Sequence, residues 1–204
     1  GYIALRHSEW KKEKRREEIC KEAAEELHFP MFVKPSNAGS SCGVSKVDNP
    51  EDLRRAVDKA LEVDRRVLIE EYIKGREVEC AVFSGVPGEV IASSVGEIKA
   101  AAEFYHYDAK YNNPDSKTEL NPGLPSAVEE KIQKAAKSVF LAVDGFSLSR
   151  VDFFFTGEEV VFNEINTMPG FTSISMYPML FHKAGWSIEE LVEKLIESAF
   201  NRPV

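Results

Sequence analysis

The spacing of apolar residues changes repeatedly along the chain and predicts an alternation of strands and helices. Short apolar runs bounded by Gly, Pro, Asn or Ser are typical of strands, and apolar residues three or four positions apart are typical of helices. Strands are expected at residues 1–6, 31–34, 44–47, 67–72, 78–83, 89–94, 147–155 and 160–166. Helices are expected at residues 8–27, 50–63 and 126–143, with two more after residue 173. This mixture predicts an α+β fold.

Capping residues mark the starts of the expected helices. Ser8 is expected to cap the first helix, and Asn49 followed by Pro50 to begin the second. Ser187 and Glu190 have the spacing of a capping box and predict the start of the last helix.

The chain changes character after Gly75, where helix-containing sequence gives way to several successive strands. We therefore expect two α+β lobes, residues 1–74 and 75–204, joined by a hinge near residues 73–76. Residues 112–125 include three prolines and one glycine and predict a long surface loop. Long loops in compact domains are usually functional or disordered.

Composition narrows the class of protein. The 204 residues carry a formal net charge of −8, which argues against a nucleic-acid partner or an anionic membrane surface. No apolar run approaches the ~18 residues of a membrane-spanning helix. Cys20, Cys42 and Cys80 form no CxxC pair and cannot build a disulfide framework, which indicates a reducing cytoplasm.

Small residues and hydroxyls fill residues 35–43, a segment that follows Lys34 and contains Ser40 and Ser41. Glycine in such a loop permits positive φ, and backbone N–H groups there can approach phosphate oxygens closely. The segment is not a Walker A loop, because no Gly-Lys-Ser/Thr sequence opens a following helix. A phosphate-binding loop and a plain hairpin loop both remain open.

Acidic residues cluster at the end of the strand at 67–72 and just beyond it. Glu70 could accept a hydrogen bond from the amino group of adenine, and Glu77 could accept hydrogen bonds from two ribose hydroxyls. A solvated strand end carrying surface glutamates is the alternative interpretation.

The two strands at 147–155 and 160–166 contain several charged and amide side chains that could act in catalysis or bind a metal. Residues two apart on a strand share a face, so Arg150 lies with Asp152, and Glu164 lies with Asn166. Two carboxylates and an amide suit Mg²⁺, which is bound through carboxylates and substrate phosphates. A surface hairpin with chance acids is the alternative. The expected apolar face consists of Val151, Phe153, Phe155, Val161 and Ile165.

The metal assignment depends on how these strands pair. Phe155 paired with Glu159 through a three-residue turn would place Arg150 opposite Glu164, with Asp152 one diagonal away on the same face. A four-residue turn would turn Asp152 away from Glu164, unless a bulge compensated.

Two further segments have weaker signals. Residues 167–175 form a loop that enters a helix, where backbone N–H groups can hold a carboxylate or an oxyanion; a simple connection is the alternative. Lys110 and Tyr111 end an aromatic run beside the polar loop, where they would suit closure over phosphates or simple packing.

Taken in order, these motifs resemble the D-alanine–D-alanine ligases, which have the ATP-grasp fold. The matching segments are Val-Lys-Pro-Ser at 33–36, Gly-Ser-Ser-Cys-Gly at 39–43, Leu-Ile-Glu-Glu-Tyr at 68–72, Asp-Ala-Lys-Tyr at 108–111, Ser-Arg-Val-Asp at 149–152 and Asn-Glu-Ile-Asn-Thr-Met-Pro-Gly-Phe-Thr at 163–172. The resemblance implies two α+β lobes enclosing a nucleotide site. It covers only the central and C-terminal portions of the family, so we expect a fragment that lacks the N-terminal substrate domain.

The resemblance also implies roles for individual residues. Those expected to contact ATP are Lys34, Ser41, Glu70, Tyr72, Ile73, Glu77 and Lys110. Those expected to act in catalysis are Arg150, Ser40, Tyr111 and Gly170. Asp152, Glu164 and Asn166 are expected to hold two Mg²⁺ ions, for which Mn²⁺ could substitute. Ser175 and Met176 are expected to receive the carboxylate of the second substrate.

The implied function is the ATP-dependent joining of two D-alanines through a D-alanyl phosphate, for peptidoglycan precursors in the cytoplasm. The full-length enzyme is expected to be a homodimer, and the fragment to be inactive alone. One alternative is a ligase whose second substrate is D-serine or D-lactate. The resemblance argues against D-lactate, because relatives that use D-lactate lack the lysine–tyrosine pair that Lys110 and Tyr111 form in this sequence. The other alternative is a non-catalytic nucleotide-binding module. The joint presence of Arg150, Asp152, Glu164 and Asn166 weighs against this alternative.

Overall fold

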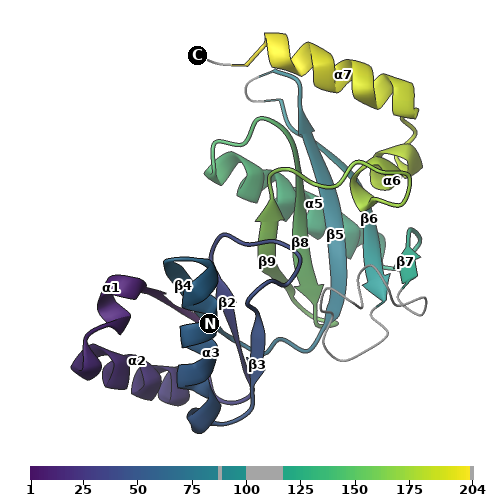
Figure 1. Ribbon diagram of the computed structural model, residues 1–204. Helices are drawn as coiled ribbons and strands as arrows, with labels where there is room; N and C mark the ends of the chain where they lie inside the picture. The colour runs from purple at the N-terminus through teal and green to yellow at the C-terminus, as the bar shows by residue number, and fades with distance from the viewer. Residues whose placement is uncertain (87–88, 100–116, 203–204) are drawn as a thin grey trace. The chain divides into compact units, whose positions relative to one another are not determined.

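The computed structural model describes residues 1–86, 89–99 and 117–202, which form two compact α+β units (Figure 1). Unit 1 comprises Gly1–Ile73, and the described part of unit 2 begins with Lys74–Lys99 and resumes at Lys117. The expected α+β class is confirmed. Within the described ranges, no helix is long and apolar enough to cross a membrane.

Unit 1 is a four-stranded antiparallel sheet covered on one face by helices. Its strand order is β1 (Tyr2–Arg6), β4 (Arg66–Glu71), β2 (Met31–Pro35) and β3 (Ser45–Val47). Side chains on alternate strand positions, such as Val33 and Ile69, pack against α2 (Glu13–Glu26) and α3 (Pro50–Val63) and are fully buried. The intervening positions therefore face away from the helices.

The expected single helix at 8–27 is wrong: the chain forms α1 (His7–Trp10) and then α2. Lys12 interrupts them with an extended backbone, and Ser8 is not a cap. Trp10 and Ile19 would lie about two and a half turns apart in one continuous helix, on opposite faces. The break lets both enter the same core, where they are 2% and 1% exposed.

The second helix begins where its capping residues predicted. The Asn49 side chain accepts hydrogen bonds from the backbone N–H groups of Glu51 and Asp52, both at 3.1 Å, and Pro50 occupies the first helical position. The amide oxygen thus satisfies two N–H groups that have no acceptor within the helix.

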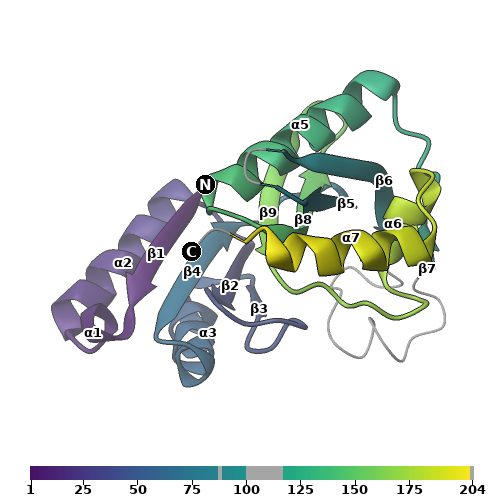
Figure 2. The ribbon, with the colours of Figure 1, turned by 90° about the horizontal axis from the view of Figure 1, so that it is seen from above.

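Unit 2 is built on a five-stranded antiparallel sheet with helices on both faces (Figure 2). Its strand order is β7 (Lys117–Glu119), β6 (Ile91–Lys99), β5 (Arg76–Ser84), β8 (Ser147–Phe155) and β9 (Val160–Asn166). The helix α5 (Ser126–Ala142) buries Ile132, Ala136 and Phe140 against one face. On the other face, α6 (Met176–Lys183) and α7 (Ile188–Phe200) cover only part of the sheet around Ala81 and Phe83. The capping box at Ser187 and Glu190 is confirmed.

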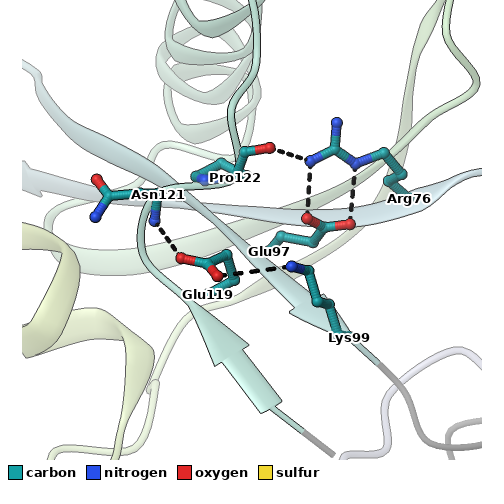
Figure 3. Close-up of polar contacts among 6 residues, drawn as sticks. All are labelled: Arg76, Glu97, Lys99, Glu119, Asn121 and Pro122. Atoms are coloured by element: carbon teal, nitrogen blue, oxygen red, sulfur yellow. Dashed lines mark hydrogen bonds and ion pairs between the residues drawn. The ribbon is translucent and has the colours of Figure 1, made fainter.

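The prediction of a surface loop at 112–125 is wrong for its second half. Residues 112–116 lie outside the described part of the chain, whereas β7 pairs with β6 and Leu124 is buried. The Arg76 guanidinium anchors the segment, because it donates to the Pro122 carbonyl and forms a two-point ion pair with Glu97 (Figure 3). The strand expected at 89–94 accordingly continues to Lys99.

The hairpin of β8 and β9 has the boundaries predicted but a different register. Phe155 pairs with Val160 across a four-residue turn, so the expected pairing with Glu159 is wrong. The register shifts between Asp152 and Phe153, with Asn163 as the extra residue of a β-bulge on β9.

The bulge changes which residues face each other. Asp152 lies directly opposite Glu164, and Arg150 lies opposite Asn166, not opposite Glu164 as expected. Because opposed residues project to the same side, all four share one face. The expectation that Val161 lies on the apolar face is also wrong, since Val160 is the residue that packs against the core.

Candidate functional site

In unit 1 the polar candidates lie on the sheet face that carries no helix. Lys34 on β2 and Glu70 on β4 form an ion pair with 2.8 Å between Nζ and Oε2. Their side chains are 16% and 25% exposed. The lysine expected at the ATP phosphates and the glutamate expected at adenine are therefore in direct contact in this structure.

Aromatic rings continue this face beyond the ion pair. The Tyr72 and Phe32 rings lie 5.9 Å apart between centroids, and the Lys46 ammonium lies 5.4 Å from the Tyr72 centroid. Tyr72 and Ile73 directly follow β4, and both are partly buried. A flat apolar ring with cations beside it suits a nucleotide base and its phosphates.

The loop after β2 has an unusual backbone. Ser40 and Ser41 have φ of +54° and +56°, and Cys42 N–H donates to the Gly39 carbonyl at 3.1 Å. Consecutive left-handed residues other than glycine are strained, and such strain concentrates at functional sites. At Gly43, with φ +75°, a Cβ would lie 2.9 Å from the Pro35 side chain, so glycine is required there.

In unit 2 the candidates meet on the sheet face left open beside α6. The Arg150 guanidinium donates to both carboxylate oxygens of Asp152, each at 2.7 Å. Its Nε also lies 3.1 Å from Oε2 of Glu79 on β5. Burial alone would lower the pKa of Arg150, but the carboxylates of Asp152, Glu79 and Glu164 raise it above its ordinary value. Arg150 thus carries a fixed positive charge, 15% exposed.

Glu79 is the one member of this charged group that the sequence interpretation missed. It lies on β5 directly opposite Asp152, it shares a face with Glu77, and only 8% of it is exposed. A signal was available, since Glu77 and Glu79 alternate with the apolar Val78 and Cys80.

Asn166 lies on the same face of the sheet, and the loop that follows it begins there. The Asn166 side-chain oxygen accepts a hydrogen bond from the Met168 N–H at 3.1 Å. Farther along, a Cβ on Gly170 would lie 2.9 Å from Ser175 Oγ. The structure therefore brings the expected oxyanion residue Gly170 next to the expected substrate residue Ser175.

Ser175 closes this loop onto α6. Its hydroxyl accepts from Thr172 N–H at 3.0 Å and lies 2.9 Å from Thr172 Oγ1. Met176 is only 5% exposed because its side chain belongs to the core beneath α6. Its contribution to a ligand would therefore come from the backbone at the start of the helix.

Two predicted residues cannot be compared with these groups, and one hollow lies apart from them. Lys110 and Tyr111 are outside the described residues. A hollow of about 420 Å³ lies between the loop and α7, and it is lined by Phe171, Val192, Leu195, Ile196, Ala199 and Phe200. This lining carries no charged side chain and does not suit a phosphate.

The open face of unit 2 has the donor chemistry of a Mg²⁺ site. Asp152 and Glu164 offer carboxylate oxygens from adjacent strands, and Asn166 offers an amide oxygen on the same face. No cluster of three His, Cys, Asp or Glu suited to a metal occurs in the described ranges. Two carboxylates with an amide fit Mg²⁺, which takes its remaining ligands from substrate phosphates and water.

The comparisons with known proteins agree with this geometry. A family model described as "D-ala D-ala ligase C-terminus" matches residues 1–197. This chain belongs to the D-alanine–D-alanine ligase family. It is 50% identical over 188 residues to a D-alanine–D-alanine ligase of Acetivibrio thermocellus, with 91% of this chain and 50% of the relative covered. The chain spans about half the length of the curated relatives that it matches.

Solved structures of the ligase family have the same fold. The VanG D-Ala:D-Ser ligase from Enterococcus faecalis superposes with a TM-score of 0.82 at 37% identity, covering 96% of this chain and 55% of that one. A D-alanine–D-alanine ligase from Bacillus anthracis complexed with ATP gives a TM-score of 0.75 at 27% identity, covering 98% and 60%. The ATP-grasp fold expected from the family resemblance is confirmed.

Proposed function

We propose that this chain carries the nucleotide-binding and catalytic part of an ATP-dependent D-alanine–D-alanine ligase. The observation that carries the proposal is the buried Arg150–Asp152 pair, opposite Glu164 and Asn166 on one sheet face, in a chain of this family. The product would be a peptidoglycan precursor dipeptide.

The chemistry requires activation of a carboxylate. The carboxylate of the first D-alanine takes the γ-phosphoryl group of ATP, which gives D-alanyl phosphate and releases ADP. The amine of the second D-alanine then attacks the acyl carbon and loses a proton. A tetrahedral oxyanion forms, and inorganic phosphate leaves as the peptide bond is made. Mg²⁺ bound through Asp152, Glu164 and Asn166 would neutralise charge on the transferring phosphoryl group.

The chain's own residues supply positioning and charge. In unit 1, Lys34 pairs with phosphate oxygens, the Ser40–Ser41 loop covers them, and Glu70, Tyr72 and Ile73 bind adenine. In unit 2, Glu77 accepts hydrogen bonds from the ribose. The Lys34–Glu70 contact supports these roles, because it places the two on one face. We assign Lys110 and Tyr111 to closure over the phosphates on the family resemblance.

Arg150 and Gly170 are the proposed oxyanion partners. The guanidinium is held by two carboxylates, so it does not reorganise as negative charge develops. The Gly170 N–H adds a second donor. Ser175, with the backbone of Met176, receives the carboxylate of the second D-alanine; the Ser175 hydroxyl beside Gly170 supports this assignment.

A second substrate of D-serine is the rival within the enzyme class. One observation favours it, the TM-score of 0.82 with the VanG D-Ala:D-Ser ligase. The 50% identity to a D-alanine–D-alanine ligase outweighs that observation. A cytoplasmic location and a homodimeric full-length enzyme complete the proposal and rest on the family resemblance.

Nucleotide binding and turnover test the proposal separately. Calorimetry with Mg·ADP on the 204-residue chain should show binding, and Lys34→Ala should weaken that binding about tenfold. Phosphate release by the natural protein that carries this sequence should depend on D-alanine, and D-serine should replace the second D-alanine poorly. Binding of nucleotide with no D-alanine-dependent phosphate release would support a non-catalytic module instead.

A further inference from the structure

The buried Glu79 carboxylate has no role in the proposed chemistry. It lies on β5, directly opposite Asp152 on β8, and it is 8% exposed. Burying a carboxylate has a large desolvation cost unless the charge is paired. Arg150 pairs with this charge, since its Nε lies 3.1 Å from Glu79 Oε2.

Arg150 and a divalent cation compete for the same oxygens. Both oxygens of Asp152 accept hydrogen bonds from Arg150 at 2.7 Å. A cation bound to Asp152 would take at least one of those oxygens, and it would repel the guanidinium. Arg150 therefore needs a second anionic partner if it is to remain on this face when the cation is bound.

The strand order provides that partner on the correct side. The sheet runs β5, β8, β9, so Asp152 lies between Glu79 on one neighbouring strand and Glu164 on the other. Glu164 is itself a proposed cation ligand. Glu79 lies on the side away from Glu164, where it can hold the guanidinium without approaching the cation.

We propose that Glu79 is a positioning residue, which holds Arg150 when the cation occupies Asp152. The inference rests on the proposed function, since it assumes the cation site on Asp152 and Glu164. It has two consequences. Glu79 makes Asp152 available to the cation, and it keeps the guanidinium on the face where the oxyanion forms.

Binding of Mn²⁺ to the 204-residue chain tests the role of Glu79. The concentration of free Mn²⁺ is measured by electron paramagnetic resonance. Glu79→Gln keeps the side-chain size but removes the charge that attracts Arg150. It should weaken Mn²⁺ binding about tenfold, the lower end of the effect of losing a group that orients a metal ligand. Unchanged Mn²⁺ affinity would overturn the inference.

Glu97→Gln is a matched control. Glu97 is a buried carboxylate of the same sheet, 6% exposed, and it forms a two-point ion pair with Arg76 (Figure 3). It lies opposite Val78, and therefore on the other face of the sheet from Glu79. Its loss should lower stability comparably and leave the Mn²⁺ affinity within about twofold. An equal loss of Mn²⁺ affinity in both variants would mean a general structural effect and would overturn the inference.

Glu79→Asp separates contact from charge. Aspartate retains the negative charge but is one methylene shorter, so it loses the contact with Arg150. Weaker Mn²⁺ binding by Glu79→Asp supports positioning, whereas wild-type affinity would show that charge alone matters and would overturn the inference. Glu79→Asp also tests the inference if Glu79→Gln does not fold. Absence of Mn²⁺ binding by the wild-type chain would overturn the cation site of the proposed function itself.

Discussion

Asp152 on β8 lies directly opposite Glu164 on β9, although a four-residue turn joins the two strands. With a regular ladder that turn would place Asn163 opposite Asp152 and send Glu164 to the apolar face. The bulge at Asn163 adds one residue to β9 just before the polar positions. It lets Val160 and Ile165 pack against the core while Glu164 and Asn166 face the other side.

Changing the length of β9 on either side of Glu164 should therefore have opposite outcomes. Deleting Asn163 removes the bulge but leaves Glu164 as the next residue opposite Asp152. We expect Mn²⁺ affinity to stay within about twofold of wild type. Inserting one alanine between Ile165 and Asn166 moves Asn166 off this face by one position, and we expect Mn²⁺ affinity to fall about tenfold.

Both variants keep Ile165 opposite Val151, so their core packing is comparable. Thermal unfolding of the two proteins checks this before Mn²⁺ is titrated. Loss of Mn²⁺ binding in the Asn163 deletion, in a folded protein, would contradict the assignment of the bulge.

Local signals predicted the elements that depend on a few neighbouring residues. The helix from Pro50 to Val63 begins at its capping residue Asn49, and β8 has the boundaries read from alternating apolar residues. Capping and alternation act within one element, so the sequence alone contains them.

What the sequence did not predict depends on contacts between distant residues. Trp10 enters the core and donates its indole N–H to Asp58 at 2.7 Å, which requires a break before α2 that no local signal marks. At the hairpin, Val160 and Val161 are chemically identical, so only the packed sheet decides which faces the core. The Arg150–Glu79 contact likewise joins strands that are far apart in the sequence.

Replacing Arg150 by lysine should abolish most turnover without removing the charge. Lysine cannot form the two parallel hydrogen bonds that hold the guanidinium on Asp152. We expect kcat for D-alanine-dependent phosphate release by the natural protein to fall about 10²- to 10³-fold, as for the loss of an oxyanion donor. Arg76→Lys, which breaks a comparable two-point pair on the other sheet face, should retain near-normal kcat (Figure 3). Similar kcat losses in both variants would contradict the role of Arg150.

Cys42 should be the first thiol to react with an alkylating reagent. It is exposed in the proposed phosphate loop, whereas Cys20 is half-buried and Cys80 is buried. Burial raises the pKa of Cys20 and raises that of Cys80 to about 12, so neither forms thiolate readily at pH 8. Mass spectrometry after brief treatment with N-ethylmaleimide should show label at Cys42, and Mg·ADP should slow the labelling. A Cys42→Ser chain should remain unlabelled over the same time, and faster labelling at Cys80 would refute the prediction.

Alkaline pH should destabilise unit 2 through two buried acids. The Tyr177 ring is fully buried and its hydroxyl donates to the Val82 carbonyl at 3.2 Å, while Cys80 lies in the core on the other sheet face. Burial raises the pKa of Tyr177 above its ordinary value and that of Cys80 to about 12. In the unfolded chain these groups lose their protons near pH ~10 and ~8.5.

The sign follows from proton binding. Above those unfolded pKa values the folded state holds more protons than the unfolded state, so the free energy of unfolding falls as pH rises. Each group contributes a slope of up to about 1.4 kcal/mol per pH unit, Cys80 from about pH 8.5 and Tyr177 from about pH 10. Below about pH 8 neither group changes stability.

Urea unfolding between pH 7 and 11 measures this slope for unit 2. The fluorescence of Trp186 reports the unfolding, in a chain that carries Trp10→Phe. Cys80→Ala should flatten the curve from about pH 8.5 upward, and Tyr177→Phe should flatten it only above about pH 10. Both substitutions lower stability at neutral pH by losing packing or a hydrogen bond, so the slopes are compared and not the absolute values. Identical slopes in wild type and both variants would show that other groups cause the alkaline transition.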